Sequence, residues 1–253
     1  MSTILITGAS SGLGAEMARQ FAASGHDLAL CARRTDRLEE LRAEILATHP
    51  PKDGTERRVE LRALDVNDDA QVFEVFRAFR DDFGRLDRVV VNAGGGKGAP
   101  LGTGRHDANR ETAMTNFVAA LTQAEAAMEV FREQDAGHLV LVSSMSAMRG
   151  MPKSMTVYAA TKAALSHLGE GLQNELYGKP IKVTVLHCGY IASEMNESVA
   201  QQVRFMVPTE QGVRAMVSAI EKEKAHAYVP PLPWAALAPV MKHAPLGVLK
   251  RLL

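Results

Sequence analysis

The sequence predicts an α/β fold, with a doubly wound parallel sheet of about seven strands and helices on both faces. Short apolar runs of strand length recur along the chain, and each is separated from the next by a stretch long enough for a helix. Strands that alternate with amphipathic helices form βαβ units, and these build a parallel sheet. We expect residues 1–253 to form one domain, because this architecture commonly uses that length without splitting.

The predicted elements follow in order along the chain. The apolar runs span residues 3–7, 28–32, 59–64, 89–91, 138–142 and 181–186, with a weaker seventh at 227–229. Apolar residues fall at helical spacing between the second and third runs and again between the third and fourth: Leu38, Leu41 and Ile45, then Val72, Val75, Phe76 and Phe79. Asp36 and Asp68 are the expected N-caps of these two helices.

Charge and cysteine content exclude several classes of function. Lys plus Arg equals Asp plus Glu, at 29 each, so a nucleic-acid partner is not expected. Cys31 and Cys188 lie in or beside apolar strands, which predicts buried thiols in a reducing compartment and no disulfide. The first apolar run begins close to Met1, and no apolar run approaches the roughly 18 residues of a membrane span. A cytoplasmic protein is therefore expected.

A glycine-rich turn follows the first predicted strand. Residues 7–14 read Thr-Gly-Ala-Ser-Ser-Gly-Leu-Gly and lead into a helical pattern. Glycines let the backbone approach a pyrophosphate closely, and the N–H groups at a helix N-terminus neutralise its charge. The spacing G-x-x-x-G-x-G differs from the common G-x-G-x-x-G, so the turn alone fits either a dinucleotide site or an ordinary tight turn.

Two further motifs follow apolar strands. Asn92-Ala93-Gly94-Gly95 comes after the fourth run, and Tyr158 and Lys162 come after the fifth. Ligands bind at the carboxyl ends of strands in an open α/β sheet, so the three motifs should line one crevice. This crevice is the predicted functional site.

With these motifs the chain resembles the compact branch of the short-chain dehydrogenase/reductase family. The resemblance covers nearly the whole chain and is carried, in the family's order, by residues 7–14, Asp65, Asn92, Ala93, Gly94, Asn116, Ser143, Ser144, Tyr158, Lys162 and Gly189. It implies a Rossmann-type NAD(P)-binding domain and an oxidoreductase that interconverts a carbonyl and an alcohol by hydride transfer.

Tyr158 and Lys162 stand four residues apart, which places both side chains on one face of a helix. A nearby ammonium favours phenolate, so the pKa of Tyr158 should fall from about 10 toward neutrality and make it a proton donor and acceptor. The resemblance implies that Lys162 also binds the nicotinamide ribose. A bare Y-x-x-x-K pair is common on solvated helices, and only its position after the glycine turn and a serine pair favours catalysis.

Ser144 and Asn116 complete the predicted catalytic set. Ser144 ends the fifth strand and should polarise a carbonyl oxygen while Tyr158 protonates it. The interval from Ser144 to Tyr158 is one residue longer than the family's usual one, so Ser143 and Ser146 remain alternatives. Asn116 resembles the asparagine that in the family holds a water leading protons to the lysine. The alternative is a buried asparagine bonded to helix backbone.

The adenine side predicts NADP(H) in preference to NAD(H). An acidic residue after the second strand would accept the ribose hydroxyls of NAD, but Arg33 and Arg34 stand there. A guanidinium suits a 2′-phosphate, although a solvated basic helix start is the alternative. The resemblance implies no metal. It also implies three groups of cofactor contacts. The pyrophosphate would meet Gly8, Ser10, Ser11, Gly12, Leu13 and Gly14, the adenine would meet Asp65, Val66, Asn92, Ala93 and Gly94, and the nicotinamide side would meet Gly189, Ile191 and Ser193.

The last quarter of the chain carries the predicted substrate region. Where the family usually shows Pro-Gly, this chain has Cys188-Gly189. The absence of the proline should make the backbone less rigid, but it removes no catalytic group. Residues 193–208 should form a lid over a hydrophobic ketone or acyl substrate, unless their apolar residues pack into the core: Met195, Val199, Phe205, Met206 and Val207. Lys97, in the loop opposite, either meets an anionic substrate group or has no role.

Residues 230–253 form an apolar extension. Short helices broken by Pro239 and Pro245 are expected to pack over the lid or a neighbouring subunit of a homodimer or homotetramer. The alternative is that they lie on a membrane, with Trp234 and basic residues at the interface.

The sequence thus predicts an NADP(H)-dependent oxidoreductase acting on a small carbonyl or alcohol substrate. A catalytically silent NADP(H)-sensing protein would need the glycine turn but not the intact set of Ser144, Tyr158 and Lys162. An epimerase or dehydratase could share the Tyr-Lys pair, but such relatives generally carry a longer substrate region.

Overall fold

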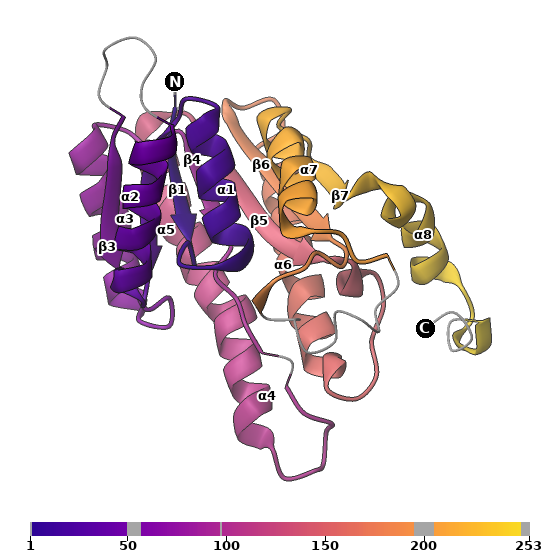
Figure 1. Cartoon of the computed structure of the whole chain (residues 1–253). Coiled ribbons are helices and arrows are strands. Elements are labelled where there is room, and N and C mark those ends of the chain that lie inside the picture. The colour runs from indigo at the N-terminus through magenta and orange to yellow at the C-terminus, as the bar shows by residue number, and fades with distance from the viewer. Residues whose placement is uncertain (1, 50–56, 97, 195–204, 249–253) are drawn as a thin grey trace.

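The computed structural model describes residues 2–49, 57–96, 98–194 and 205–248. Their strands form one parallel sheet in the order β3-β2-β1-β4-β5-β6-β7, shown in Figure 1. The strands are β1 (Thr3–Thr7), β2 (Asp27–Ala32), β3 (Val59–Ala63), β4 (Arg88–Val91), β5 (Gly137–Ser144), β6 (Ile181–Cys188) and β7 (His226–Val229). The predicted fold class is confirmed, and the strand order reverses between β1 and β4, where a crevice opens at the carboxyl ends.

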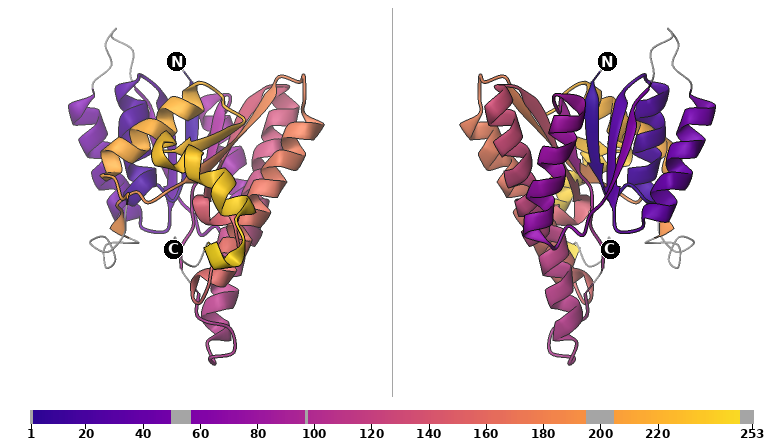
Figure 2. Two further views of the ribbon diagram at one scale, coloured as in Figure 1. Left: turned by 90° about the vertical axis from the view of Figure 1, so that its right-hand side faces the viewer. Right: turned by 90° about the vertical axis from the view of Figure 1, so that its left-hand side faces the viewer.

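Helices cover both faces of the sheet, as the two side views of Figure 2 show. Helices α1 (Gly12–Ala23), α2 (Thr35–Thr48) and α7 (Thr209–Glu221) pack on one face through a core that includes Phe21, Leu38 and Met216. Helices α3 (Asp69–Phe83), α5 (Ala119–Gln134) and α6 (Met155–Glu175) pack on the other face. Because both faces are covered, β1 and β4 are buried at every residue.

The two expected helix caps have different outcomes. Asp68 is the N-cap of α3, and its Oδ1 accepts a hydrogen bond from the backbone N–H of Gln71 at 3.0 Å. Asp36 was expected to cap α2, but this is wrong, because α2 begins at Thr35 and Arg34 is the N-cap residue. Asp36 lies in the first turn, where a carboxylate interacts favourably with the helix dipole instead.

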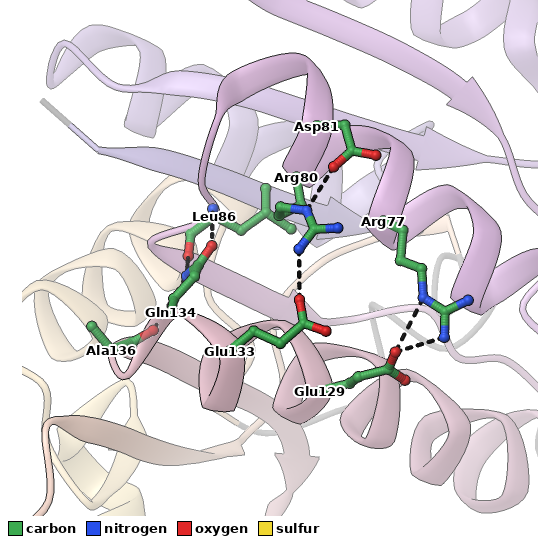
Figure 3. A network of polar contacts seen from close by, with 8 residues as sticks. All are labelled: Arg77, Arg80, Asp81, Leu86, Glu129, Glu133, Gln134 and Ala136. Carbon is green, nitrogen blue, oxygen red and sulfur yellow. Dashed lines mark hydrogen bonds and ion pairs between the residues drawn. The ribbon is translucent and has the colours of Figure 1, made fainter.

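Polar contacts join α3 to α5 on the outer surface (Figure 3). Arg77 pairs with Glu129 and Arg80 with Glu133, each at 2.6 Å. These pairs lie at the surface, where solvent screens them, so they contribute little to stability. Gln134 of α5 bonds both the N–H and the carbonyl of Leu86, at 2.9 and 2.8 Å, just before β4. The C-terminal end of α5 thereby fixes the backbone just before the central strand β4.

Helix α4 (His106–Ala113) and the loop before it project beyond the carboxyl edge of the sheet (Figure 1). The chain then passes through a π-helical segment, η1 (Met114–Val118), into α5. This irregular turn carries Asn116 back toward the crevice, where its side chain is buried.

The C-terminal region matches the expected short helices only in part. Helix α8 (Pro231–His243), in which Leu232 has a non-helical backbone, runs through Pro239, so the predicted break there is wrong. The helix ends before Pro245, and residues 246–248 are helical again, as expected. Trp234, Ala238 and Met241 of α8 pack against Met145 of the 3-10 helix η2 (Met145–Met148). None of the described helices is long and apolar enough to cross a membrane.

Candidate active site

A cavity of about 510 Å³ lies at the carboxyl ends of the strands. It brings together all of the predicted site residues except Gly14, and those lining it are Gly8, Ser10, Ser11, Gly12, Leu13, Arg33, Arg34, Asp65, Val66, Asn92, Ala93, Gly94, Asn116, Ser144, Tyr158, Lys162, Gly189, Ile191 and Ser193. A Cβ at Gly14 would overlap the carbonyl oxygen of Gly8, so Gly14 allows close packing of α1 on the turn instead.

The glycine turn forms one wall of the cavity. Gly8 has φ +64°, and a Cβ there would lie 2.9 Å from Cα of Ala93. Gly12 has φ +53° and opens α1 directly after Ser11, its N-cap residue. A side chain at either position would be strained, so the turn keeps backbone exposed beside the positive end of α1, an arrangement that suits a pyrophosphate.

Thr7 and Asn92 hold the turn against β4. The Thr7 hydroxyl accepts hydrogen bonds from the N–H groups of Asn92 and Ala93, both at 3.1 Å. The Asn92 amide donates to the Thr7 carbonyl at 2.9 Å. The sequence motif included Thr7 but gave no sign of this bridge, which depends on two strands that are distant in the sequence.

Asn116 forms hydrogen bonds with Gly95, in the loop that follows β4, rather than with helix backbone. Its Oδ1 accepts from the N–H of Gly95 at 2.9 Å, and its Nδ2 donates to the Gly95 carbonyl at 2.8 Å. Asn109 and Thr112 of α4 bond the N–H groups of Ala99 and Gly98 in the same loop, at 2.9 and 3.0 Å. The loop is therefore tied to α4 and η1, while Lys97 lies outside the described residues.

The three candidate serines have distinct environments. Ser143 is buried, where its hydroxyl donates to the Lys162 carbonyl at 2.9 Å and lies 2.8 Å from the Ser166 hydroxyl. Ser146 donates through its N–H and hydroxyl to the Ser144 Oγ, at 3.2 and 3.0 Å. The Ser144 hydroxyl also acts on Tyr158, because it opposes the rise in the pKa of that residue. Ser144 is thus the serine paired with Tyr158 in the cavity.

Tyr158 and Lys162 do not show the expected electrostatics. Burial raises the pKa of Tyr158 to about 12, against an opposing effect of the Ser144 hydroxyl. Lys162 Nζ lies 5.9 Å from the centroid of the Tyr158 ring and donates to the Val142 carbonyl at 2.9 Å. Burial also lowers the pKa of Lys162 to about 8. The predicted fall in the pKa of Tyr158 is wrong for this structure, because burial has the largest effect on this pKa and Lys162 does not lower it.

One end of the cavity is basic, because Arg33 and Arg34 line it. Arg34 donates to the hydroxyls of Ser10 at 3.2 Å and Ser11 at 2.7 Å, which fixes its guanidinium beside the glycine turn. Arg33 lines the cavity and forms no ion pair with any other described residue. Asp65 accepts at Oδ1 from the N–H of Asn67 at 3.1 Å, so it shapes the turn before α3 without capping the helix.

An aromatic cluster lies beside Gly189, a residue that lines the cavity. The indole of Trp234 packs so closely on Gly189 that a Cβ would overlap Nε1. Trp234 is 5% exposed and meets the rings of Tyr190 at 5.6 Å and Phe205 at 6.2 Å, centroid to centroid. Sequence reasoning singled out Trp234 only as part of the tail, because nothing in its spacing shows its approach to Gly189.

The predicted lid is partly described. Residues 195–204, including Met195 and Val199, lie outside the described residues. On either side the chain is anchored, since Ile191 forms a β-bridge with Val207 and the Thr209 hydroxyl donates to the Ala192 carbonyl at 2.7 Å. Both anchors lie beside the cavity.

Comparison with known proteins agrees with this architecture. A family model described as short chain dehydrogenase matches residues 2–204. An uncharacterized oxidoreductase of Mycobacterium tuberculosis is 50% identical over 248 residues, covering 98% of this chain and 96% of the relative. An uncharacterized oxidoreductase of Myxococcus xanthus is 32% identical over 237 residues, covering 94% of this chain and 89% of the relative. The chain therefore belongs to the short-chain dehydrogenase/reductase family, and it is an oxidoreductase of that family.

Solved structures of the family are similar throughout the chain. A short-chain dehydrogenase from Sphingobium yanoikuyae in complex with NADPH is 26% identical, covers 99% of this chain and 96% of its own, and superimposes with a TM-score of 0.82. A short-chain dehydrogenase/reductase from Burkholderia phymatum in complex with NAD is 20% identical, covers 95% of this chain and 92% of its own, with the same TM-score of 0.82. At 20% identity, the similarity to the Burkholderia phymatum structure supports the fold alone.

Proposed function

We propose that this protein interconverts a carbonyl and an alcohol on an apolar substrate, with NADP(H) as the hydride carrier and Tyr158 as the acid/base. The observation that carries the proposal is that Tyr158, Ser144 and Lys162 line the same cavity as the glycine turn. A bound nicotinamide would supply the hydride. Every other step is assigned to side chains of this chain.

The proton of Tyr158 is available for reduction. Because its pKa is about 12, the hydroxyl stays protonated at neutral pH and can donate to the oxygen of a carbonyl as negative charge develops there. The Ser144 hydroxyl can donate to the same oxygen and polarise it. Lys162, with a pKa of about 8, is largely charged at pH 7, and we assign it to the nicotinamide ribose. Asn116 holds the adjoining loop in place.

The residues of the cavity fit a dinucleotide, and the basic end favours NADP(H). Arg33 and Arg34 can pair with a 2′-phosphate, for which NAD(H) offers no equivalent. Charge-assisted bonds of roughly 1.5–3 kcal/mol imply at least about a tenfold tighter binding of NADPH than of NADH. Arg33→Ala should remove most of that preference in calorimetric titrations. Arg42→Ala is the matched control, because Arg42 pairs with Glu39 outside the cavity. Equal affinities of the unmutated protein would refute the NADP(H) preference.

An apolar substrate is supported by the aromatic side chains beside Gly189, which lines the cavity. The side chains of Tyr190 and Phe205 are 38% and 49% exposed beside buried Trp234. Consumption of NADPH, followed by absorbance with a panel of ketones, aldehydes and 3-oxoacyl thioesters, tests the proposed reaction. We expect turnover with at least one apolar member of the panel. Tight NADPH binding without any turnover would favour a nucleotide-sensing protein instead.

A further inference from the structure

Glu194 places a carboxylate at the basic end of the cavity, which it lines together with Arg33 and Arg34. Its Oε1 and Oε2 lie 2.9 and 3.1 Å from Nη1 of Arg37, and Oε2 lies 3.8 Å from Nη1 of Arg34. The guanidinium proposed to meet a 2′-phosphate therefore already faces a negative charge of the chain itself.

We infer that Glu194 is an internal anion that competes with the 2′-phosphate of NADP(H) for Arg34 and so reduces the preference for NADP(H) over NAD(H). The inference rests on the proposed dinucleotide site. A phosphate that approaches Arg34 must either displace the carboxylate or bind close to a like charge. The ribose hydroxyls of NAD(H) are neutral and can donate hydrogen bonds to a carboxylate. Glu194 thus weakens the binding of NADP(H), and it leaves the binding of NAD(H) unchanged or strengthens it.

The surroundings of Glu194 allow its side chain to move without rearranging the backbone. The stretch before it is anchored, because Ala192 donates its N–H to the Val207 carbonyl at 2.9 Å and accepts from the Thr209 hydroxyl. The Glu194 side chain is 58% exposed. Arg37, which does not line the cavity, can hold the carboxylate aside when Arg34 turns to a phosphate. Arg37 then acts through Glu194 as a positioning residue.

Glu194→Gln tests the inference, because it keeps the size of the side chain and removes its charge. Dissociation constants of NADP⁺ and NAD⁺ are measured by calorimetry on the full chain, together with the thermal unfolding midpoint. We expect NADP⁺ to bind about three- to tenfold tighter, with NAD⁺ unchanged or weaker, and the gain to shrink at high salt. Glu44→Gln is the matched control, since Glu44 accepts from Arg19 at 2.7 Å outside the cavity, and it should change neither constant.

Arg37→Met separates the positioning role from direct phosphate binding. Without Arg37, Glu194 is free to pair with Arg34, so NADP⁺ binding should weaken. In Glu194→Gln/Arg37→Met the effect of removing Arg37 should vanish, because nothing remains for Arg37 to hold. Equal weakening of NADP⁺ in both backgrounds would instead assign Arg37 to the phosphate and contradict its positioning role.

The outcomes distinguish this inference from the proposed cofactor preference. An unmutated protein that favours NAD⁺, with a shift toward NADP⁺ in Glu194→Gln, would refute the proposed preference and support the role of Glu194. A protein that favours NADP⁺, with a ratio of the two constants that is unchanged or lower in Glu194→Gln, would overturn the inference alone. Binding of neither nucleotide would overturn both.

Discussion

Replacement of Gly189 by alanine tests whether this glycine serves the packing of Trp234 or only the cofactor. The added methyl group would overlap Nε1 and Cε2 of the indole and lie 2.5 Å from Cδ1. Trp234 is 5% exposed and packed among Met145, Ala238 and Met241, so the ring cannot turn away without opening that cluster. Overpacking of this kind costs about 1–3 kcal/mol, and we expect Gly189→Ala to reduce the free energy of unfolding by that amount.

The assay is urea unfolding followed by far-UV circular dichroism, with intrinsic fluorescence as a second probe. Trp234 is the only tryptophan of the chain, so a shift in emission of the folded variant reports directly on its environment. Gly171→Ala is the control, because a Cβ at Gly171 in α6 would meet nothing within 4 Å. The control should be stabilised by roughly 0.5–1 kcal/mol through helix propensity.

A double-mutant cycle gives the decisive result. Trp234→Leu removes the ring that the new methyl group would strike, although it leaves a cavity of its own. Gly189→Ala/Trp234→Leu should therefore be less destabilised than the sum of the single variants, by about 1–3 kcal/mol. Additivity within about 0.5 kcal/mol would refute the proposed clash. A change in NADPH affinity with no change in stability would assign Gly189 to the cofactor alone.

Three further predictions follow from the structure. Lys162→Ala should weaken NADPH binding in calorimetric titrations, and an unchanged affinity would contradict its proposed contact with the ribose. His138 is buried and hydrogen-bonded to Arg88 at 3.0 Å, and burial followed by the charge of Arg88 lowers its pKa to about 3. In the unfolded chain, His138 takes up a proton near the ordinary histidine pKa of about 6.5. The contribution of His138 to stability is therefore complete above that pH and is lost as the pH falls toward 3. Between pH 7 and 5, the free energy of unfolding measured in urea titrations should therefore fall by about 1–2 kcal/mol less in His138→Gln than in the unmutated protein. Equal decreases would show that His138 is not involved. Truncation after Tyr228 removes α8 and exposes the cluster around Met145, so the shortened chain should aggregate or change its mass in light scattering; normal solubility, mass and turnover would show that the extension is dispensable.

The position of the site could be predicted from the sequence, because it depends on topology. Once the strands are known to be parallel, their carboxyl ends lie at one edge, so the turn after β1, Asn92, Ser144 and Tyr158 must gather there. The alternation of apolar runs and helical spacing was sufficient to predict all seven strands.

The electrostatics and the contacts between distant segments could not be predicted in this way. The pKa of Tyr158 depends on its depth and on the direction in which Lys162 points, and spacing along a helix gives neither. The carboxylate of Glu194 meets Arg34 and Arg37 across more than 150 residues of chain. Pro239 was expected to end a helix, but α8 continues through it where Ala238 and Met241 pack into the core.

The central claim is that Tyr158 transfers the proton in a hydride-transfer reaction, and the turnover of Tyr158→Phe tests it most directly. The phenyl ring keeps the packing and removes only the hydroxyl group of Tyr158. With the carbonyl substrate that gives the highest rate of NADPH oxidation, we predict that kcat falls by about 10²–10⁴-fold while the dissociation constant of NADPH stays nearly unchanged. A variant that retains more than about a tenth of the unmutated kcat would contradict the account, because loss of the acid/base group cannot leave so much activity.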